Sequence, residues 1–344
     1  MRLFPTILIG IAAAGLMVDG YAEGDILIKL APTLSSLKVQ YHRPREIPFP
    51  KENPYTDAKY ELGRILFFDP RLSNSGIMAC SSCHNPSLSW TDGLPKGVGD
   101  DRKTLPRKTP SIQNLAWDEL FFWDGRADSL EVQALGPITS EVEMNMSMTK
   151  LVDKLNSIKG YNDLFAKAFP PKGEISEHTI SQALATFVRK QVSDVAPFDL
   201  WIAGDEKAIS ESAKRGFAIF NGKANCVACH EGWRFSDGSF HDIGLKSDDI
   251  GRGKYLPKIS AMHHAFKTVS LRNIAQRAPY MHDGSMTTLE EVIDHYDTGG
   301  EHRQSVSDEI FPLHLTAQEK KDLVEFLKTL TSLPKTETIP ELPK

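Results

Sequence analysis

The sequence predicts a mainly α-helical protein of two domains with long loops. At 344 residues the chain exceeds one typical domain. Apolar residues recur at helical spacing in several segments, and runs with the strict alternation of a β-strand are scarce. We therefore expect a first domain at 55–200 and a second at 201–335, preceded by a segment at 1–22 and an irregular arm at 23–54.

The segment 1–22 has the pattern of a secretory signal peptide. Met1-Arg2 is followed by an apolar run from Leu3 to Val18 and by small residues around Ala22. A retained membrane anchor is the alternative, but the run is short for a bilayer span and is bracketed by Pro5 and Asp19. We expect export to the periplasm and cleavage near Ala22. No later stretch is long and apolar enough to predict a membrane span.

The composition restricts the partners. The formal net charge is -5, and the sequence has no run of lysines and arginines. This pattern argues against nucleic acid and against an anionic membrane surface. A small basic electron-carrier protein would fit the charge better.

In the first domain the spacing predicts a helix that begins near Thr56 and ends near Asp69. A loop-rich stretch is expected at 85–117, because turn-forming residues interrupt every apolar pattern there. Apolar residues at helical spacing then predict helices at 151–169 and 175–192. The segment 196–204 is expected to connect the domains.

In the second domain Ser210 is expected to open a helix. Two capping boxes mark later helices, Thr287 with Glu290 and Thr316 with Glu319. The order of helix, phenylalanine, short turn and cysteine pair occurs twice, at 66–84 and 217–230. This weak internal repeat suggests two related modules.

All four cysteines lie in two C-x-x-C pairs, each followed directly by a histidine. The motifs are Cys80-Ser81-Ser82-Cys83-His84 and Cys226-Val227-Ala228-Cys229-His230. Two disulfides are the default for an exported chain, but a disulfide does not need the histidine. A zinc site built from both pairs is the chemical rival, although 142 residues (226 minus 84) separate them, unlike a zinc ribbon. Haem attachment uses every residue, with the thiols as thioethers and the imidazole as iron ligand. The sequence therefore predicts two covalently bound c-type haems in two cytochrome c-like haem domains with long loops.

Further motifs accompany the two pairs in a fixed order. They are Phe122-Trp123-Asp124-Gly125-Arg126-Ala127, Pro137, Val142-Glu143-Met144 and Ala278-Pro279-Tyr280-Met281-His282-Asp283-Gly284. Over about residues 55–332 the chain thereby resembles the bacterial di-haem cytochrome c peroxidase and MauG family. The resemblance implies an oxidoreductase that uses hydrogen peroxide.

The resemblance implies that His84 is the proximal ligand of a peroxidatic haem and that Glu143 is the carboxylate above it. A carboxylate there can move a proton from one peroxide oxygen to the leaving oxygen. Gln133 and Pro137 match further positions of this pocket, although Gln133 also suits an exposed helix. Trp123 matches a tryptophan that relays electrons between the haems; a core aromatic residue is the alternative.

Many members of this family carry a distal histidine in the loop after the first motif. Here no histidine lies between His84 and His178, and the matching loop at 97–101 offers only carboxylates. We therefore expect a five-coordinate first haem that needs no reductive activation. The nearby Met144, Met146 and Met148 are interpreted as flexible core residues rather than iron ligands.

At the second haem the resemblance implies that His230 is the proximal ligand and that Tyr296, 14 residues after His282, is the distal one. Other members have methionine at this position, and MauG has tyrosine. A phenolate favours ferric and higher oxidation states and lowers the potential. His295 and Met286 stay open as competing ligands.

Two positions depart from the family pattern. Where the family has an asparagine ligand of a calcium ion, this chain has Lys108, and the carbonyl ligands match Arg277 and Pro279. An ammonium group cannot ligate calcium, so calcium binding is in doubt and the lysine could act as a point charge instead. MauG also passes oxidising equivalents through a tryptophan two residues before the second motif, where this chain has Ala224.

The predicted function is that of a periplasmic di-haem peroxidase that reduces hydrogen peroxide with electrons relayed from the C-terminal haem, supplied by a small cytochrome or copper protein. The alternative is a MauG-like oxidase that uses peroxide and a bis-ferryl state to modify a residue on a partner protein. A pure electron carrier is the third hypothesis. It is disfavoured because a carrier gains from two filled axial positions on each iron.

Overall fold

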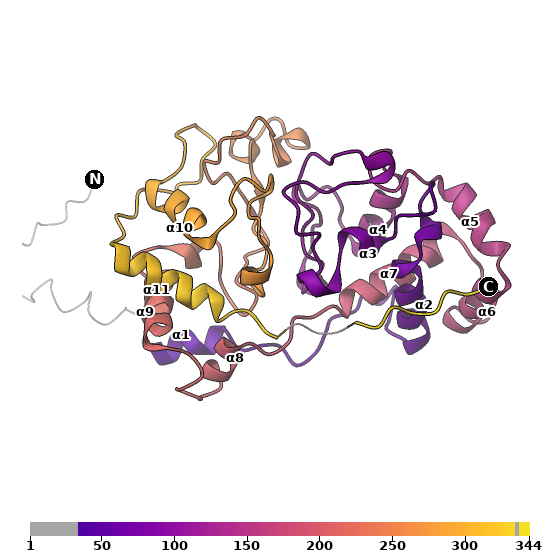
Figure 1. Cartoon of the computed structure of the whole chain (residues 1–344), viewed down its shortest axis with the longest axis horizontal. Helices are drawn as coiled ribbons and strands as arrows, with labels where there is room; N and C mark the ends of the chain where they lie inside the picture. Colours follow the sequence, from indigo (N-terminus) through magenta and orange to yellow (C-terminus); the bar gives the residue numbers. More distant parts are fainter. Residues whose placement is uncertain (1–33, 334–336) are drawn as a thin grey trace, which may run out of the picture.

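The computed structural model describes residues 34–333 and 337–344, arranged in two lobes side by side (Figure 1). The expected signal peptide at 1–22 and the first part of the arm lie outside the described residues. The first lobe contains the helices α2 (Asp57–Phe68), α3 (Cys80–Cys83), α4 (Leu130–Thr139), α5 (Met148–Asn156), α6 (Lys159–Ala168) and α7 (Glu177–Arg189). The second contains α1 (Leu34–Gln40), α8 (Pro197–Ile202), α9 (Glu211–Asn221), α10 (Leu289–Thr298) and α11 (Ala317–Lys328).

The strand content is small. In the described part of the chain the only named strands are β1 (Phe240–His241) and β2 (Phe266–Lys267), which pair antiparallel. Loops with single turns of 3-10 helix connect the rest, including the whole stretch 85–117. The mainly helical class with long loops is thus confirmed.

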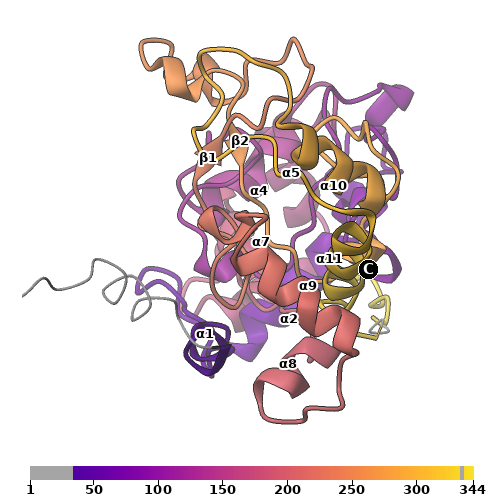
Figure 2. The same ribbon diagram turned by 90° about the vertical axis from the view of Figure 1, so that its left-hand side faces the viewer.

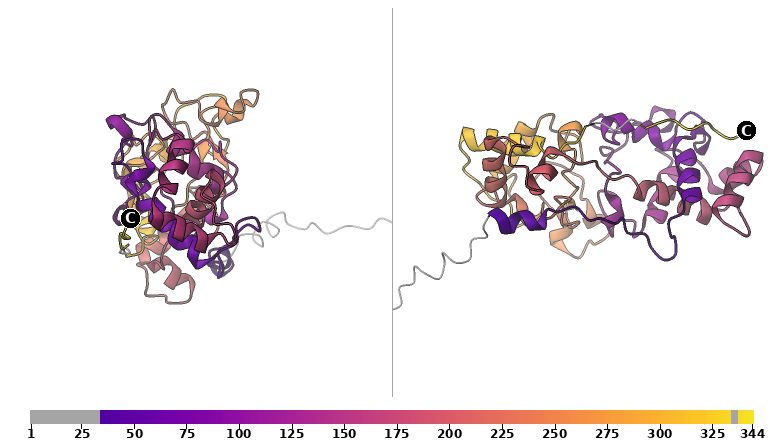
Figure 3. Two further views of the ribbon diagram at one scale, coloured as in Figure 1. Left: turned by 90° about the vertical axis from the view of Figure 1, so that its right-hand side faces the viewer. Right: turned by 90° about the horizontal axis from the view of Figure 1, so that it is seen from below.

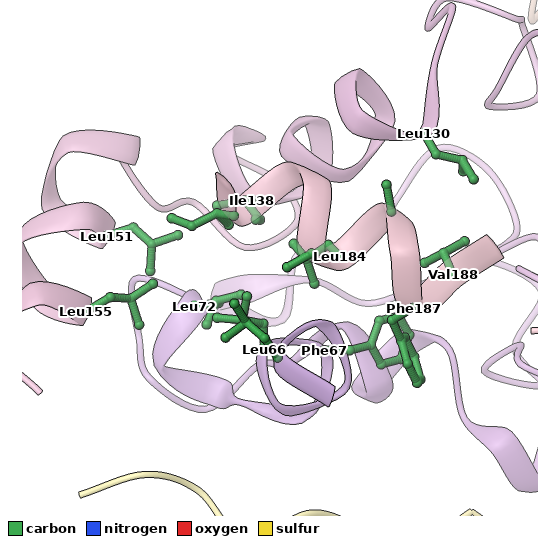
Figure 4. Close-up of a cluster of buried hydrophobic side chains, with 14 of the residues drawn as sticks. Leu66, Phe67, Leu72, Leu130, Ile138, Leu151, Leu155, Leu184, Phe187 and Val188 are labelled. Carbon is green, nitrogen blue, oxygen red and sulfur yellow. The ribbon is translucent and has the colours of Figure 1, made fainter. Parts of the chain in front are cut away.

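The core of the first lobe is built where α2 crosses α7. Phe67 packs against Phe187 with ring centroids 4.9 Å apart (Figure 4). The helices touch at Gly63, where a Cβ atom would lie 2.0 Å from the carbonyl oxygen of Ala183. Only glycine allows the two backbones to approach so closely.

The core of the second lobe repeats this arrangement with α9 on α11 (Figure 2). Here Gly216 is the contact point, since a Cβ atom would lie 2.0 Å from the carbonyl oxygen of Asp322. In both lobes the helix before the cysteine pair therefore crosses a later helix at a glycine. This geometry supports the two related modules that the weak sequence repeat suggests.

A second repeat links 108–131 with 267–290, each residue corresponding to the one 159 positions later (267 minus 108). Both copies contain a 3-10 turn that follows an asparagine with positive φ, Asn114 (φ 63) and Asn273 (φ 60). Both then form an antiparallel bridge, Phe121 with Ala127 and Tyr280 with Met286. The two copies contact each other reciprocally, because Lys108 N donates to His282 O and Lys267 N to Trp123 O, each at 2.8 Å. The two motifs Phe-Trp-Asp-Gly and Met-His-Asp-Gly are thus equivalent in structure.

The first and the last described segments each pack on the lobe that is distant in sequence (Figure 3). Tyr41, which follows α1, is buried between Phe198 and Phe217 in the second core. The tail at 337–344 lies on the first lobe, where Gly160 N donates to the carbonyl oxygen of Lys344 at 3.0 Å. These end segments tie the two lobes together.

The helices at 57–68, 177–189, 211–221 and 317–328 confirm the expected ones. Three expectations on local structure were wrong. The arm at 23–54 contains α1; the expected helix at 151–169 is broken between Asn156 and Lys159; and the connection at 196–204 forms α8. Helix α8 forms because Phe198 and Trp201 are buried in the second core, so tertiary packing outweighs the turn-like sequence.

One capping box lies one residue later in the sequence than expected. Helix α10 is capped by Thr288 with Glu291 rather than by Thr287 with Glu290. The Glu291 carboxylate accepts from both the Thr287 and the Thr288 backbone N–H groups, which fixes the later start. The box of Thr316 with Glu319 is confirmed. None of the helices in 34–333 or 337–344 is both long and apolar enough to cross a bilayer.

Candidate functional site

Each cysteine pair lies on a single helical turn that follows the glycine-containing helix of its lobe in the sequence. In the first motif α3 closes with His84 N donating to Cys80 O at 2.9 Å, and in the second His230 N donates to Cys226 O at 2.8 Å. Cys80 packs against the first core and Cys226 against the second. A zinc site shared by the two pairs does not fit this placement, and none of the four cysteines forms a disulfide.

Both motif histidines are held in one tautomer. His84 Nδ1 lies 3.1 Å from the carbonyl oxygen of Trp90, and His230 Nδ1 lies 2.8 Å from that of Phe235. A carbonyl oxygen can only accept, so Nδ1 carries the proton and Nε2 keeps its lone pair. Burial lowers the pKa of both imidazoles, which also favours the neutral ring. Both side chains are thus prepared to ligate a metal through Nε2.

A cavity of about 1000 Å³ lies beside the first motif. Cys80, Cys83 and His84 line it, together with Gln133, Pro137, Glu143, Trp123 and Lys108 from other segments. Its size is at the upper end of the range, about 300–1000 Å³, of small-molecule sites. The structure therefore brings the predicted residues of the first site around one cavity, and a haem joined to the two cysteines fits it.

Glu143 is positioned by the loop at 97–101. Asp100 N donates to the carbonyl oxygen of Glu143 at 2.6 Å, and a Cβ atom on Gly99 would lie 1.9 Å from the carbonyl oxygen of Val142. The loop and the Glu143 segment thus touch backbone to backbone. Of the loop's two carboxylates, Asp100 is buried and accepts from Ser75 N, while Asp101 is exposed.

The Glu143 carboxylate makes no hydrogen bond or ion pair among the described residues. The negative charge of Glu143 nevertheless affects both cysteines of the first motif. Burial raises the pKa of Cys80 to about 12 and that of Cys83 to about 11, and the negative charge of Glu143 adds to both shifts. Gln133 and Pro137 of α4 line the same cavity, and Gln133 is half-buried rather than exposed. The expected methionine cluster is buried in the first core.

Trp123 lies between the two repeat copies. Its indole Nε1 donates to the carbonyl oxygen of Lys108 at 2.8 Å, and its ring meets the His282 ring edge-on with centroids 6.4 Å apart. The side chain is half-buried and lines the cavity of the first motif. It is therefore fixed in place where the two lobes meet.

At the second motif Tyr296 of α10 packs against the core that contains Cys226. Burial, together with the nearby Cys226 and Cys229 thiols, raises the pKa of the Tyr296 hydroxyl. No hydrogen bond from this hydroxyl is found within the described residues. Without a bound cation the hydroxyl therefore stays protonated at neutral pH.

The two competing ligands differ in their surroundings. His295 Nε2 lies 2.9 Å from the carbonyl oxygen of Ile243, so this nitrogen is used as a donor. Met286 packs partly buried against the same core as Tyr296 and stays a rival. Ala224 is buried next to the second motif and has no redox-active side chain.

The position that matches the family's calcium site, at Lys108 and the carbonyls of Arg277 and Pro279, does not suit a cation. The side chains of Lys108 and Arg277 are both buried there, and the Lys108 Nζ and Arg277 Nε atoms have no hydrogen-bond partner within the described residues. Two buried positive charges would repel a calcium ion. The residues present therefore do not fit that ion.

Two residues at the cavity are not marked by any motif in the sequence. The first is Arg107, which donates to Asp124 and to Asp249 at 2.6 Å each and so joins the lobes at the cavity. The second is Arg277, whose buried side chain lines the cavity. Alignment of 108–131 with 267–290 would have revealed Arg277, because it corresponds to the acidic Asp118.

Comparisons with known proteins agree with this arrangement. Residues 57–207 match the family described as di-haem cytochrome c peroxidase, and residues 213–331 match the cytochrome c family. The chain is 54% identical over 312 residues to methylamine utilization protein MauG of Methylorubrum extorquens, which covers 90% of this chain and 88% of the relative. It is 35% identical to cytochrome-c peroxidase IdrP1 of a Pseudomonas species, over 88% of this chain and 90% of the relative. Among solved structures, a MauG-like protein associated with microbial copper homeostasis matches with a TM-score of 0.78 and 35% identity, covering 84% of this chain and 94% of the other.

Proposed function

The chain belongs to the di-haem cytochrome c peroxidase and MauG family, and on that basis we propose that it is an exported oxidase that uses hydrogen peroxide to oxidise a partner protein. Family membership assigns it two c-type haems and oxidoreductase chemistry. The proposal goes beyond family membership in naming a protein as the reductant. That choice rests on the residues of the second haem site.

The observation that carries this proposal is that Tyr296 packs, partly buried, against the same core as Cys226 and lies near enough to Cys226 and Cys229 to sense their charges. An anionic phenolate ligand stabilises ferric and higher oxidation states, whereas a thioether stabilises the ferrous state. A haem with such a ligand is well suited to hold oxidising equivalents. It is less well suited to take electrons from a carrier protein and pass them to the first haem. The 54% and 50% identities to two MauG proteins agree with this choice.

In this proposal Cys80, Cys83 and His84 hold the first haem, and Cys226, Cys229, His230 and Tyr296 hold the second. The haem irons supply the site of peroxide binding and the redox chemistry. The carbonyls of Trp90 and Phe235 keep each imidazole in the ligating tautomer.

Glu143 acts on the protons of peroxide. Its carboxylate takes the proton from one peroxide oxygen and returns it to the oxygen that leaves as water. No neighbouring side chain of the described residues competes for it, so it is free to accept. Gln133 on the same cavity wall can orient the bound peroxide through its amide group. The loop at 97–101 holds the Glu143 backbone while this occurs.

Trp123 relays electrons between the two sites. An indole can lose one electron, and its N–H is fixed by the Lys108 carbonyl. Each peroxide accepts two electrons and two protons and yields two water molecules. The two electrons come from the partner protein, which is oxidised at one of its residues.

We further propose that the partner takes part in methylamine utilization, the process for which two relatives are named. Ala224 cannot conduct electrons, so the partner receives oxidising equivalents at a surface other than the one used by MauG. Export to the periplasm fits the pattern at 1–22.

A peroxidase that takes electrons from a small cytochrome or copper protein is the second candidate. The cavity with Glu143 supports it equally, and one peroxidase relative is 35% identical over most of the chain. The two functions differ in the source of the electrons.

The test combines a measurement of steady-state turnover with the growth of a strain that lacks the gene. Purified holoprotein is mixed with peroxide and with a reduced small c-type cytochrome or copper protein, and the oxidation of the donor is followed. We expect negligible steady turnover, and we expect deletion of the gene to abolish growth on methylamine, with rescue by the wild type but not by Glu143→Gln. Rapid steady oxidation of the donor together with normal growth would support the peroxidase instead.

A further inference from the structure

The repeat of 108–131 in 267–290 places two lysines in equivalent positions with opposite surroundings. Lys267 is buried, and its Nζ lies 2.7 Å from the carboxylate of Asp118. Lys108 is also buried, at 5% exposure, but its Nζ has no partner within the described residues. One lysine is therefore neutralised and the other is not.

The two lysines differ in their surroundings because one neighbouring position carries opposite charges in the two copies. The residue that corresponds to Asp118 is Arg277 (118 plus 159). Where the second lysine has a carboxylate as neighbour, Lys108 thus has the guanidinium group of Arg277, whose charge acts on it. Arg277 is 7% exposed; its Nη1 donates to Ser270 O at 2.9 Å and its Nη2 to Gln113 at 3.3 Å, while Nε is unpaired.

Two adjacent buried cations are costly without an anion. The removal of one charge from water carries an effective penalty of several kcal/mol, and like charges add repulsion. Burial and the charge of Arg277 lower the pKa of Lys108, and burial lowers that of Arg277 to about 9. Asp92 is the acidic residue that acts on Lys108, but its carboxylate is engaged by Thr109 Oγ1 at 2.6 Å. The protein itself therefore leaves this pair without a direct counter-ion.

The anion must reach the pair from the cavity. Lys108 and Arg277 both line it together with Cys80, Cys83 and His84. A haem joined to these cysteines carries two propionate carboxylates, and a carboxylate is the anion that ammonium and guanidinium groups bind best. A free oxyanion from solution has the same chemistry and is the alternative source.

We propose that Lys108 and Arg277 form a built-in cationic site that binds the propionate carboxylates of the first haem and replaces a divalent metal ion between the two lobes. The Lys108 backbone already joins the lobes, since its N–H donates to His282 O, while its carbonyl accepts from Trp123 of its own lobe. The side chain adds a fixed charge at the same point. The region consequently needs no bound calcium.

The first experiment measures metal in the purified holoprotein. After dialysis against a calcium-containing buffer, we expect less than about a tenth of a calcium ion per chain, and no change in the haem spectra on addition of a chelator. One tightly bound calcium ion per chain, with a spectral change on its removal, would overturn the proposal.

The second experiment measures the midpoint potential of the first haem in Lys108→Met. A nearby positive charge favours the ferrous state, so its removal should lower the potential, by about tenfold in the reduction equilibrium or about 59 mV for one electron. Lys108→Arg should restore the wild-type value, and Lys167→Met, which removes an exposed lysine of α6, should leave it unchanged. An unaltered potential in Lys108→Met would contradict the proposal.

The third experiment separates the two sources of the anion. The potential of the wild type is measured with increasing acetate at constant ionic strength. Bound propionates predict no dependence on acetate, whereas a clear dependence would assign the site to a free anion and overturn the propionate assignment. None of these readouts uses peroxide or a partner protein, so they can fail independently of the proposed function.

Discussion

The indole Nε1 of Trp123 donates a hydrogen bond of 2.8 Å to the carbonyl oxygen of Lys108. The N–H of Lys108 in turn donates to the carbonyl oxygen of His282, and His282 corresponds to Trp123 in the internal repeat. The Trp123 indole is thus fixed by a backbone carbonyl of its own copy, and that residue is in turn held by the backbone of the opposing copy. Its orientation does not depend on a flexible side chain.

Trp123→Phe tests the relay. Phenylalanine retains the aromatic ring but is much harder to oxidise and cannot donate to Lys108. We expect the response of the second haem to peroxide added at the first to slow by about tenfold or more, which corresponds to about 1.4 kcal/mol of barrier. Stopped-flow spectroscopy measures this rate. Trp117→Phe, at a half-buried tryptophan outside the bridge, serves as the control, and an equal effect of both variants would remove the special role of Trp123.

Glu143→Gln tests the proton shuttle. The amide keeps the size of the side chain but cannot accept and return a proton, so the reaction with peroxide should slow by about 10²- to 10⁴-fold. The resting spectrum should stay that of the wild type. Glu141→Gln changes an exposed neighbour and should have no effect on the rate. An unchanged rate in Glu143→Gln would exclude this carboxylate from the reaction.

Tyr296→Met tests the second iron ligand. A neutral thioether favours the ferrous state more than a phenolate does, so the midpoint potential of the second haem should rise. His295→Gln is the matched control, because glutamine can still donate to the Ile243 carbonyl as His295 does. A shift in His295→Gln with none in Tyr296→Met would assign the ligand to His295.

Asp322 on α11 gives a prediction on stability and pH. Its hydrogen-bonded ion pair with Arg215 of α9 lowers the pKa of Asp322 to about 2 from an ordinary 3.8. A lowered folded-state pKa contributes stability that is complete above about pH 4 and is lost as the pH falls through about 2. Asp322→Asn should therefore cost about 1–2 kcal/mol of unfolding free energy at pH 7, after allowance for screening by solvent.

The measurement for Asp322→Asn is denaturant unfolding followed by circular dichroism at several pH values. The variant should lose much of the dependence on pH between about 4 and 2. Glu325→Gln, which removes an exposed pair with Lys328 on the same helix, should change stability by less than about 0.5 kcal/mol. Equal losses in the two variants would show that the partly covered Arg215 pair is worth no more than a surface pair.

Much of the first site could be predicted because its residues lie in short motifs whose chemistry is local. Cys80, Cys83 and His84 are neighbours in sequence, and one helical turn is enough to present them together. Helix starts at Ser210 and Thr316 were also predictable, since a side chain caps a backbone N–H three residues away.

The contacts between distant segments could not be predicted in the same way. The carbonyl of Phe235 and the charge of Arg277 become functional only when the chain folds, and no periodic pattern marks them. Helix α8 was missed for a related reason, because its stability comes from the burial of Phe198 and Trp201 in the second core. The Thr288 cap differs from the expected one by one residue, because adjacent threonines and adjacent glutamates allow two registers and Glu291 binds the backbone N–H groups of both threonines.

We propose that the two haem sites are unequal, with His84 and Glu143 serving a haem that reacts with peroxide and His230 and Tyr296 together serving a haem that does not. Electron paramagnetic resonance and visible spectra of the purified ferric protein, at rest and after one equivalent of peroxide, test it most directly. We predict a high-spin ferric signal from one haem, a tyrosinate-like spectrum from the other, and a response to peroxide without prior reduction. A methionine-to-iron charge-transfer band, or two low-spin haems that ignore peroxide until one is reduced, would contradict it.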